Sequence, residues 1–384
     1  MECYLDNSAT TQCASEVTDL VIRAMREDYG NPSSMHLKGV EAEKYVKKAS
    51  EQIAKTLKAE PKEILFTSGG TESDNLAIIG GAQSLNRRGR HLITTCIEHP
   101  AVLNTMAYLK KQGFEVTYLP VREDGTVDPG TVAEAMRPDT VLVSIMHTNN
   151  EIGTIEPIGE IGKLVHEKNP DCLFHVDAVQ GYTKSEIIPR KMGIDLLSVS
   201  GHKIHGPKGV GFLYVGKNVR LLPQIHGGGQ QNNLRSGTEN VPGIAGLGLA
   251  AELGYRNFSE KTKRLQDLKT YFAKELQKEE EVFVNGPLVS EGAVHILNVS
   301  FTGVRSEVML HALEDKGIFV SAGSACSSHK REPSATMKAI GLTPERMESA
   351  LRFSFSDLTT GEELDYTLGV IHELLPFYRK YRRK

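Results

Sequence analysis

The sequence predicts an α/β fold with a mostly parallel sheet. Short apolar runs rich in β-branched residues alternate with helical stretches over the first two-thirds of its 384 residues, as βαβ units do. Two of these runs lead directly into Asp177 and Lys203. Ligands bind beyond the carboxyl ends of the strands in open α/β sheets, so we expect a site with a carboxylate and an amine at this edge.

The expected elements follow one another in a regular order. Strand-like runs bounded by turn residues occupy 64–67, 91–95, 115–119, 140–146, 173–177, 196–200 and 209–215. Helical patterns are expected over 71–79, from near residue 100, and over a long stretch at 246–278. A β-rich tail then contains runs at 282–284, 293–301 and 318–320. We place a domain boundary near residue 255, with a large domain over 10–255 and a smaller α+β domain formed by 1–9 and 256–384.

Composition and charge narrow the class of protein. Hydrophobic residues make up 39% and charged residues 24% of the chain, as in soluble globular proteins. No apolar run approaches the roughly 20 residues of a membrane span, and the first residues lack the regions of a signal peptide. A net charge of −3 gives no reason to expect nucleic-acid binding, and five cysteines without a C-x-x-C pair indicate a reducing compartment. We therefore expect a cytoplasmic protein with no membrane partner.

Asp177, Lys203 and a glycine loop suit pyridoxal 5′-phosphate. In enzymes that use this cofactor, a lysine forms a Schiff base while an acid holds the pyridinium nitrogen. A structural salt bridge at a strand end is an equally open interpretation of this pair alone. Gly70 and Thr71 open a predicted helix, where free backbone N–H groups attract an anion, although an ordinary N-cap has the same pattern.

Two further loops carry polar side chains at the same edge. His99 follows the strand predicted at 91–95, and imidazole suits proton transfer near neutral pH, whereas a solitary histidine is more often structural. Asn149 offers an amide to a ligand, or simply forms a turn with Asn150. The spacing of Cys96 and His99 suits a metal, but no second ligand pair accompanies them, so we expect none.

Six ordered motifs resemble those of the cysteine desulfurases, which are pyridoxal-phosphate enzymes of fold type I in the class V aminotransferase group. The motifs are SGGTESDN at 68–75, EH at 98–99, NNEIG at 149–153, HVDAVQ at 175–180, GHKIHGPKG at 201–209 and RSGTEN at 235–240. The match extends from Asp6 to Ser354, and the ordered set is highly specific. It implies a seven-stranded-type, mostly parallel sheet in the large domain.

The resemblance also implies a role for each matching residue. Lys203 would form the Schiff base with pyridoxal 5′-phosphate, Asp177 would hold the pyridinium nitrogen, and Gln180 would hydrogen-bond the ring oxygen. His99 would stack on the ring and move protons. The other expected cofactor-binding residues are Gly70, Thr71, Asn149, Ser200, His202 and, from the second subunit of a homodimer, Thr238.

Substrate binding is assigned in the same way. The resemblance implies that Asn149 and Arg352 orient L-cysteine, with Arg352 binding its α-carboxylate through a bidentate fork. Taken alone, Arg352 would be interpreted as a surface charge at a strand end.

Cys326 distinguishes a desulfurase from its relatives. It lies in SAGSACSSHKREPS at 321–334, a small and polar stretch for which we expect a mobile, exposed loop. Free cysteine is usually buried and inert, so one in this setting is a candidate nucleophile. It would attack the substrate sulfur, giving a persulfide and alanine. The pattern resembles the group with a longer cysteine loop, although Ala322 replaces a commoner serine.

The resemblance implies partners that accept sulfur, either iron–sulfur scaffold proteins or tRNA-thiolation enzymes. Selenocysteine lyase and class V aminotransferase activities are the alternatives. A non-enzymatic scaffold is disfavoured by the intact Lys203, Asp177, His99 and Cys326. The basic run at 378–384 admits RNA contact, but a solvated helix end is the simpler interpretation.

Overall fold

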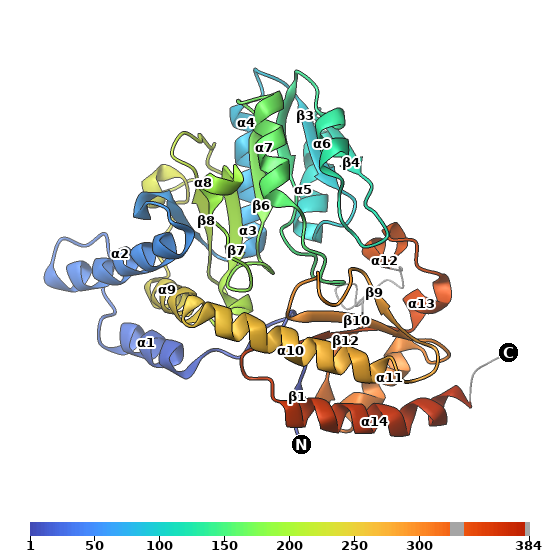
Figure 1. The fold of residues 1–384 in the computed structure, drawn as a ribbon. Coiled ribbons are helices and arrows are strands. Elements are labelled where there is room, and N and C mark those ends of the chain that lie inside the picture. The colour runs from blue at the N-terminus through green and yellow to red at the C-terminus, as the bar shows by residue number, and fades with distance from the viewer. Residues whose placement is uncertain (323–333, 381–384) are drawn as a thin grey trace.

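A computed structural model of the chain describes residues 1–322 and 334–380. Its main feature is a seven-stranded sheet with the order β2-β8-β7-β6-β5-β3-β4 (Figure 1). The strands are β2 (Ile64–Thr67), β3 (His91–Thr95), β4 (Glu115–Leu119), β5 (Thr140–Ser144), β6 (Leu173–Asp177), β7 (Leu196–Ser200) and β8 (Gly211–Val215). Neighbouring strands are parallel except at β8, which runs antiparallel to β2 and β7. The predicted α/β fold with a mostly parallel sheet is therefore confirmed.

Helices cover both faces of this sheet because its strands are apolar on both sides. Phe174 and Leu197 face one core, which contains side chains of α1 (Ser15–Arg26), α2 (Leu37–Leu57), α6 (Pro129–Ala135), α7 (Ile158–Lys168) and α9 (Val241–Tyr255). Leu173 and Leu196, one residue earlier in each strand, face a second core. That core is formed with the π-helical turn η2 (Leu76–Gly80), α4 (Gly81–Ser84) and α5 (Pro100–Lys111). The short helix α3 (Gly70–Asn75) directly precedes η2. The alternation follows from the two-residue period of a strand.

Short helical turns complete the large domain. They lie in the connections between strands or next to them, at η1 (Pro61–Glu63), α8 (Pro189–Met192), η3 (Gly201–Lys203) and η4 (Gln231–Asn233).

A separate core lies in the lower part of Figure 1, around an antiparallel sheet with the order β12-β13-β10-β9. The strands of this sheet are β9 (Val282–Asn285), β10 (Ile296–Phe301), β12 (Ser321–Ala322) and β13 (Ala350–Ser354). Its helices are α10 (Phe258–Leu276), α11 (Ser306–Glu314), α12 (Ala335–Ala339), α13 (Pro344–Glu348) and α14 (Gly361–Arg379). A parallel pair, β1 (Cys3–Tyr4) with β11 (Ile318–Phe319), joins the first residues of the chain to this region. Of all the helices that the structure describes, none has the length and apolar character to cross a membrane.

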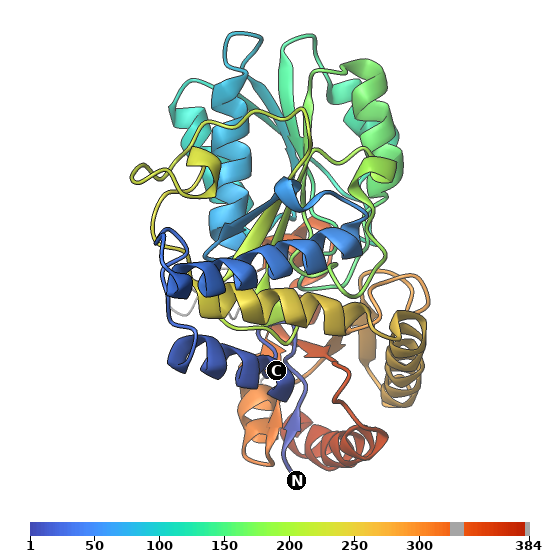
Figure 2. The same cartoon turned by 90° about the vertical axis from the view of Figure 1, so that its left-hand side faces the viewer.

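The helical run has a break between α9, which ends at Tyr255, and α10, which begins at Phe258. The sequence pattern predicts one continuous helix here, so that prediction is wrong. Asn257 has a φ of 54°, a left-handed conformation that interrupts a helix and that asparagine adopts more readily than most residues. Buried side chains of the two cores flanking the large sheet come from residues 17–251, and those of the other core from 3–5 and 265–375. We propose that the break separates two domains, with the predicted bounds of 10–255 for the large one and 1–9 with 256–384 for the small one. Figure 2 shows α9 crossing beside α2 and α10 turning away into the small domain.

Phe353 tests the contribution of the small-domain core. Its buried ring packs against Phe272 and Phe301, with centroids 5.1 and 6.2 Å away. Phe353→Ala should lower the free energy of unfolding by about 3–5 kcal/mol because it leaves a large cavity. Urea unfolding followed by circular dichroism measures this. Leu288→Ala, at a side chain that is 66% exposed, is the control; equal losses in both variants would contradict the role given to Phe353.

Candidate active site

The candidate active site lies at the carboxyl edge of the seven-stranded sheet. β6 ends at Asp177, and β7 ends at Ser200, just before the turn η3 that carries Lys203. His99 follows β3, and Asn149 follows β5. Because these strands run in the same direction, their last residues share one edge, where α/β proteins bind ligands.

Asp177 is buried, with 5% of its surface exposed. Its Oδ1 accepts a hydrogen bond of 2.9 Å from the backbone N–H of Val179. Burial raises the pKa of Asp177, while interactions with His99 and Lys203 lower it again. The structure thus brings together the acid, the amine and the imidazole that the sequence predicts for this edge.

His99 is the N-cap of α5. Its Nδ1 accepts a hydrogen bond of 3.1 Å from the N–H of Ala101, so the proton of the neutral ring is on Nε2. Burial lowers the pKa of His99; Asp177 opposes this shift and Lys203 adds to it. The ring is therefore neutral at pH 7 and presents an N–H at Nε2.

Gly69 and Gly70 form a close-fitting turn against the neighbouring loops. Gly69 has a φ of 149°, which favours glycine. A Cβ at Gly70 would lie 2.7 Å from Cγ2 of Val179 and 3.7 Å from Cβ of Ser200. The backbone approaches Val179 this closely only because Gly70 has no side chain. Backbone N–H groups at such a helix start suit an anion.

The side chains around this turn are held in place. Glu72 accepts a hydrogen bond of 2.8 Å from Nε of Arg235 and one of 2.9 Å from the N–H of Ser68. Burial alone would raise the pKa of Glu72, but these two partners lower it. Burial lowers the pKa of His202 to about 4, with Lys203 contributing. His202 is therefore a neutral donor or acceptor beside the turn.

Lys203 and Gln180 both contact the backbone of residues 6–9, at the start of the chain. The Lys203 ammonium donates to the carbonyl oxygens of Ser8 at 2.5 Å and Ala9 at 2.8 Å. Nε2 of Gln180 donates to the same Ser8 oxygen at 2.9 Å, and its Oε1 is 3.4 Å from Nε2 of His295. The first residues of the small domain therefore help to enclose the site.

Arg352 reaches the site from β13 and is 8% exposed, so it is not the surface charge that the strand end alone suggests. Its Nη1 donates to the carbonyl oxygen of Asn150 at 2.8 Å, and its Nη2 donates to Oδ1 of Asp6 at 2.7 Å. Its Nε is buried and has no hydrogen-bond partner among the residues that the structure describes. A buried guanidinium with one N–H unsatisfied is suited to receive a carboxylate.

The remaining predicted site residues differ in their burial and in their contacts. Asn149 is fully buried, and its amide already bonds its own loop: Nδ2 donates to the Ile97 carbonyl at 3.1 Å, and Oδ1 accepts from the N–H of Glu151 at 2.9 Å. Thr238 is exposed. Cys326 lies outside the described residues.

Asp6, Ser8 and His295 belong to this site, but we assigned none of them from the sequence. The hydroxyl of Ser8 and Nδ1 of His295 are buried without a hydrogen-bond partner within 1–322 and 334–380. Burial drives the pKa of His295 well below its usual value, and several nearby cations add to this. The DNSATT motif at 6–11 begins the match to the desulfurases, so Asp6 and Ser8 could have been found from it. The motif alone does not indicate what either side chain contacts.

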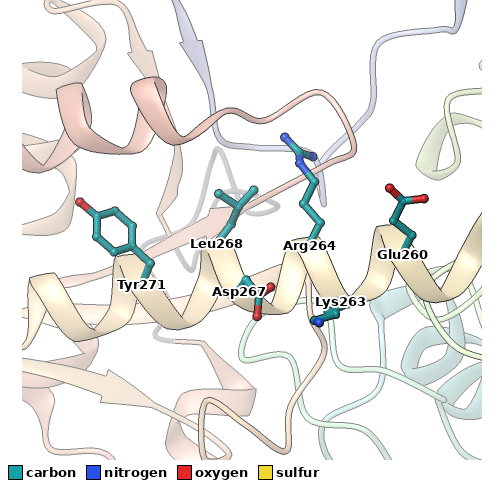
Figure 3. Close-up of a pocket in the computed structure, with 6 residues that line it drawn as sticks. All are labelled: Glu260, Lys263, Arg264, Asp267, Leu268 and Tyr271. Atoms are coloured by element: carbon teal, nitrogen blue, oxygen red, sulfur yellow. The ribbon is translucent and has the colours of Figure 1, made fainter.

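Two surface cavities are large enough to hold a small molecule. One of about 520 Å³ opens beside Thr71 and His99, next to the site. Another of about 450 Å³ lies on α10 (Figure 3). It is lined by Glu260, Lys263, Arg264, Asp267, Leu268 and Tyr271. None of these is a predicted site residue, and Arg264 already donates to the carbonyl of Asp357 at 3.1 Å.

The fold and the lysine–acid pair at its sheet edge define the class of fold type I pyridoxal-phosphate-dependent transferases. The family model for class-V aminotransferases matches residues 3–367. Cysteine desulfurase IscS of Dictyoglomus turgidum is 46% identical over 97% of this chain and 94% of its own length. The corresponding protein of Methanosarcina thermophila is 45% identical over 97% and 91%.

Solved structures agree with these relatives. A NifS-like protein superimposes with a TM-score of 0.93 at 40% identity, covering 98% of this chain and all of that one. SspA, solved in complex with cysteine, gives a TM-score of 0.82 at 36% identity over 93% of this chain and all of its own. The chain belongs to the class-V aminotransferase family and, within it, to the cysteine desulfurases. The resemblance seen in the sequence is thereby confirmed.

Gly70 provides a test of the close-fitting turn. Gly70→Ala should reduce the free energy of unfolding by about 1–3 kcal/mol, because the new methyl group overlaps Val179. Adding Val179→Ala should restore at least half of that loss, which thermal unfolding of the single and double variants measures. Gly361→Ala, where a Cβ meets nothing within 4 Å, is the matched control. Additive losses in the double variant would show that the two residues do not clash.

Proposed function

We propose that this chain is a pyridoxal-phosphate-dependent cysteine desulfurase that transfers the sulfur of L-cysteine to Cys326 and releases L-alanine. The observation that carries the proposal is the convergence of Asp177, Lys203 and His99, which is reflected in their mutual effects on pKa. Relatives named cysteine desulfurase, 43–46% identical over nearly the whole chain, support the choice of substrate.

The residues present fit the cofactor. The backbone N–H groups at the start of α3, beside Ser200, suit an anion, and we assign them to the phosphate. We assign Asp177 to accept from the pyridine nitrogen and Gln180 to bond the ring oxygen. When bound, the cofactor supplies an electron sink for the pair left behind when a proton leaves the α-carbon of cysteine. The residues assigned to the phosphate are Gly70, Thr71, Ser200, His202 and the partner subunit's Thr238.

Lys203 and His99 handle the protons. Lys203 would hold the cofactor covalently, and its free amine would take the α-proton of cysteine. His99, with its proton on Nε2, would stack on the ring without placing a second charge beside Lys203. The lowered pKa of His99 is consistent with a neutral ring at this position.

Arg352 and Asn149 hold the substrate. The unpartnered Nε of Arg352 and the adjacent Nη2 present two N–H groups to the α-carboxylate of cysteine. The buried Asn149 fixes the loop whose Asn150 carbonyl holds Nη1. Asn149 therefore orients the substrate partly through Arg352.

The Cys326 thiolate receives the sulfur. It attacks the sulfur of bound cysteine, a new S–S bond forms, and the C–S bond breaks with its electron pair passing to the three-carbon fragment. That fragment gains protons and leaves as alanine, while Cys326 keeps a persulfide. In β12, Ser321 pairs with Arg352 and Ala322 with Leu351. β12 ends four residues before Cys326 in the sequence and pairs with the strand that carries Arg352, which supports access of Cys326 to the substrate.

A homodimer completes the site in this proposal. Large apolar side chains are exposed between the end of α1 and the start of α2: Met25 at 62%, Tyr29 at 69%, Met35 at 100% and Leu37 at 82%. Exposed apolar clusters of this kind mark interaction surfaces. The exposure of Thr238 is also consistent with its reaching a second subunit.

The sulfur then passes to acceptor proteins. The name IscS of the relatives favours supply of sulfur for iron–sulfur cluster assembly, and we propose this role, with tRNA thiolation as a further outlet. Five cysteines without a C-x-x-C pair support a cytoplasmic setting.

Lys203→Ala tests the lysine assignment. The purified variant, supplied with pyridoxal 5′-phosphate, should lack the visible absorption band of the lysine-linked cofactor and form no alanine from cysteine. The absorption spectrum measures this directly. Lys191→Ala, at an exposed lysine of the same domain, should retain both band and activity. A normal band in Lys203→Ala would disprove the assignment.

Cys326→Ser separates cofactor binding from sulfur transfer. The variant should keep the visible band, since the cysteine does not hold the cofactor, while alanine formation from cysteine falls to background. Alkylation and mass spectrometry should find a persulfide on Cys326 of the unmodified protein and none on the variant. Cys13→Ser, at a partly exposed free cysteine, is the control. Wild-type turnover by Cys326→Ser would show that this cysteine is incidental.

A further inference from the structure

Asp6 lies beside Arg352 in the site, although sequence patterns assign it no role. It follows β1 and is bridged to Ser354 at the end of β13. The next two residues fasten the segment: the Asn7 side chain donates to the Ser354 carbonyl at 3.0 Å, and the Ser8 N–H donates to the Ser354 hydroxyl at 2.8 Å. The backbone that carries Asp6 is therefore fixed directly beside Arg352.

Two nitrogens of the Arg352 guanidinium have a hydrogen-bond partner, and the third has none among the described residues. Nη1 is held by the Asn150 carbonyl and Nη2 by Asp6. Nε is left without a partner in the part of the chain that the structure describes. Two anchors fix the plane of the group and leave Nε to face a ligand. Such preorganisation is what a bidentate clamp requires.

Asp6 also fixes the direction in which Arg352 points. Within 1–322 and 334–380, it is the one carboxylate in ion-pair contact with Arg352. Glu151 is a second half-buried acid whose charge interacts with Arg352. Its carboxylate accepts from the hydroxyl of Ser334 at 2.5 Å. Without Asp6, the guanidinium would turn toward Glu151, because a buried cation seeks the nearest anion.

We propose that Asp6 is a positioning residue that holds Arg352 in the orientation that receives the α-carboxylate of the substrate. The proposal rests on the function given above, in which Arg352 binds the carboxylate of cysteine. Asp6 acts through Arg352 and does not itself touch the substrate. Burial raises the pKa of Asp6, and Arg352 and then Lys203 oppose that shift.

Asp6→Ala and Asp6→Asn in the holoenzyme test the proposal. Asp6→Ala should raise the KM for L-cysteine about tenfold, the size expected for losing a hydrogen bond to a charged group, with kcat changed less than about threefold. Asp6→Asn keeps an oxygen that accepts from Nη2, so it should restore most of the lost affinity. A KM that stays unchanged or falls in Asp6→Ala would overturn the proposal, since it would mean that Asp6 merely competes with the substrate.

A pair of inhibitors distinguishes positioning from general damage. L-alanine carries the α-carboxylate, whereas ethylamine is the same molecule without it. Asp6→Ala should weaken inhibition by L-alanine about tenfold and leave inhibition by ethylamine unchanged. An equal loss for both inhibitors would overturn the proposal. Glu63→Gln is the matched control, because Glu63 is buried and pairs with Arg190 at 2.7 Å without lining the site; it should leave both inhibition constants unchanged.

Arg352→Gln distinguishes failure of this inference from failure of the proposed function. If Arg352→Gln raises the KM for cysteine but Asp6→Ala does not, the role of Asp6 is wrong and substrate binding by Arg352 stands. If Arg352→Gln leaves the KM unchanged, Arg352 does not bind the carboxylate, and both assignments fail.

Discussion

The burial of one carboxylate, that of Asp177 at the end of the central strand, sets the conditions for the rest of the site. A charge removed from water must be compensated by its neighbours, and here Lys203 and the N–H of Val179 provide that compensation. Behind it lies a second buried acid, Asp74, whose pKa is raised well above its usual value by burial and by repulsion from Asp177. His175, 3.6 Å from Asp74, has a pKa lowered by burial to about 3. Burial thus favours the protonated form of Asp74 and the neutral form of His175.

Residues 6–9 connect this charged centre to the substrate end of the site. Their carbonyl groups accept from Lys203 and Gln180, while the carboxylate of Asp6 pairs with Arg352. The same four residues therefore contact groups assigned to the cofactor and to the substrate. Because they are fastened to β13 of the small domain, a shift between the domains would alter both sets of contacts together.

Residues whose role depends on local pattern could be predicted from the sequence. Asp177 and Lys203 each follow an apolar run, and the direction of parallel strands then places them at one edge. Gly70 was predicted from a glycine turn before a helix, and the structure adds its contact with Val179, which the pattern does not contain. The break at Asn257 was missed because the helical periodicity on either side continues across it.

Residues whose role depends on distant contacts were predicted only through the family resemblance, or not at all. Arg352 looks like an exposed charge in its own strand, and its burial follows from packing against loops 200 residues away along the chain. Asp6 pairs with it across a separation of 346 residues. His295 is one of several polar residues in a β-rich tail until Gln180 is placed beside it. The spacing and periodicity of a sequence do not show which distant residues are in contact.

The pairing of residue 6 with residue 352 has a consequence for how the protein is made on the ribosome. The cores of the large domain use residues 17–251, so that domain is able to form early, as N-terminal domains do during synthesis. Residues 3–6 have no such option, since their partners in β11 and β13 are translated much later. The emerging chain therefore carries this segment unpaired through most of elongation, and a product cut short before β13 lacks Arg352, the residue proposed to bind the substrate carboxylate.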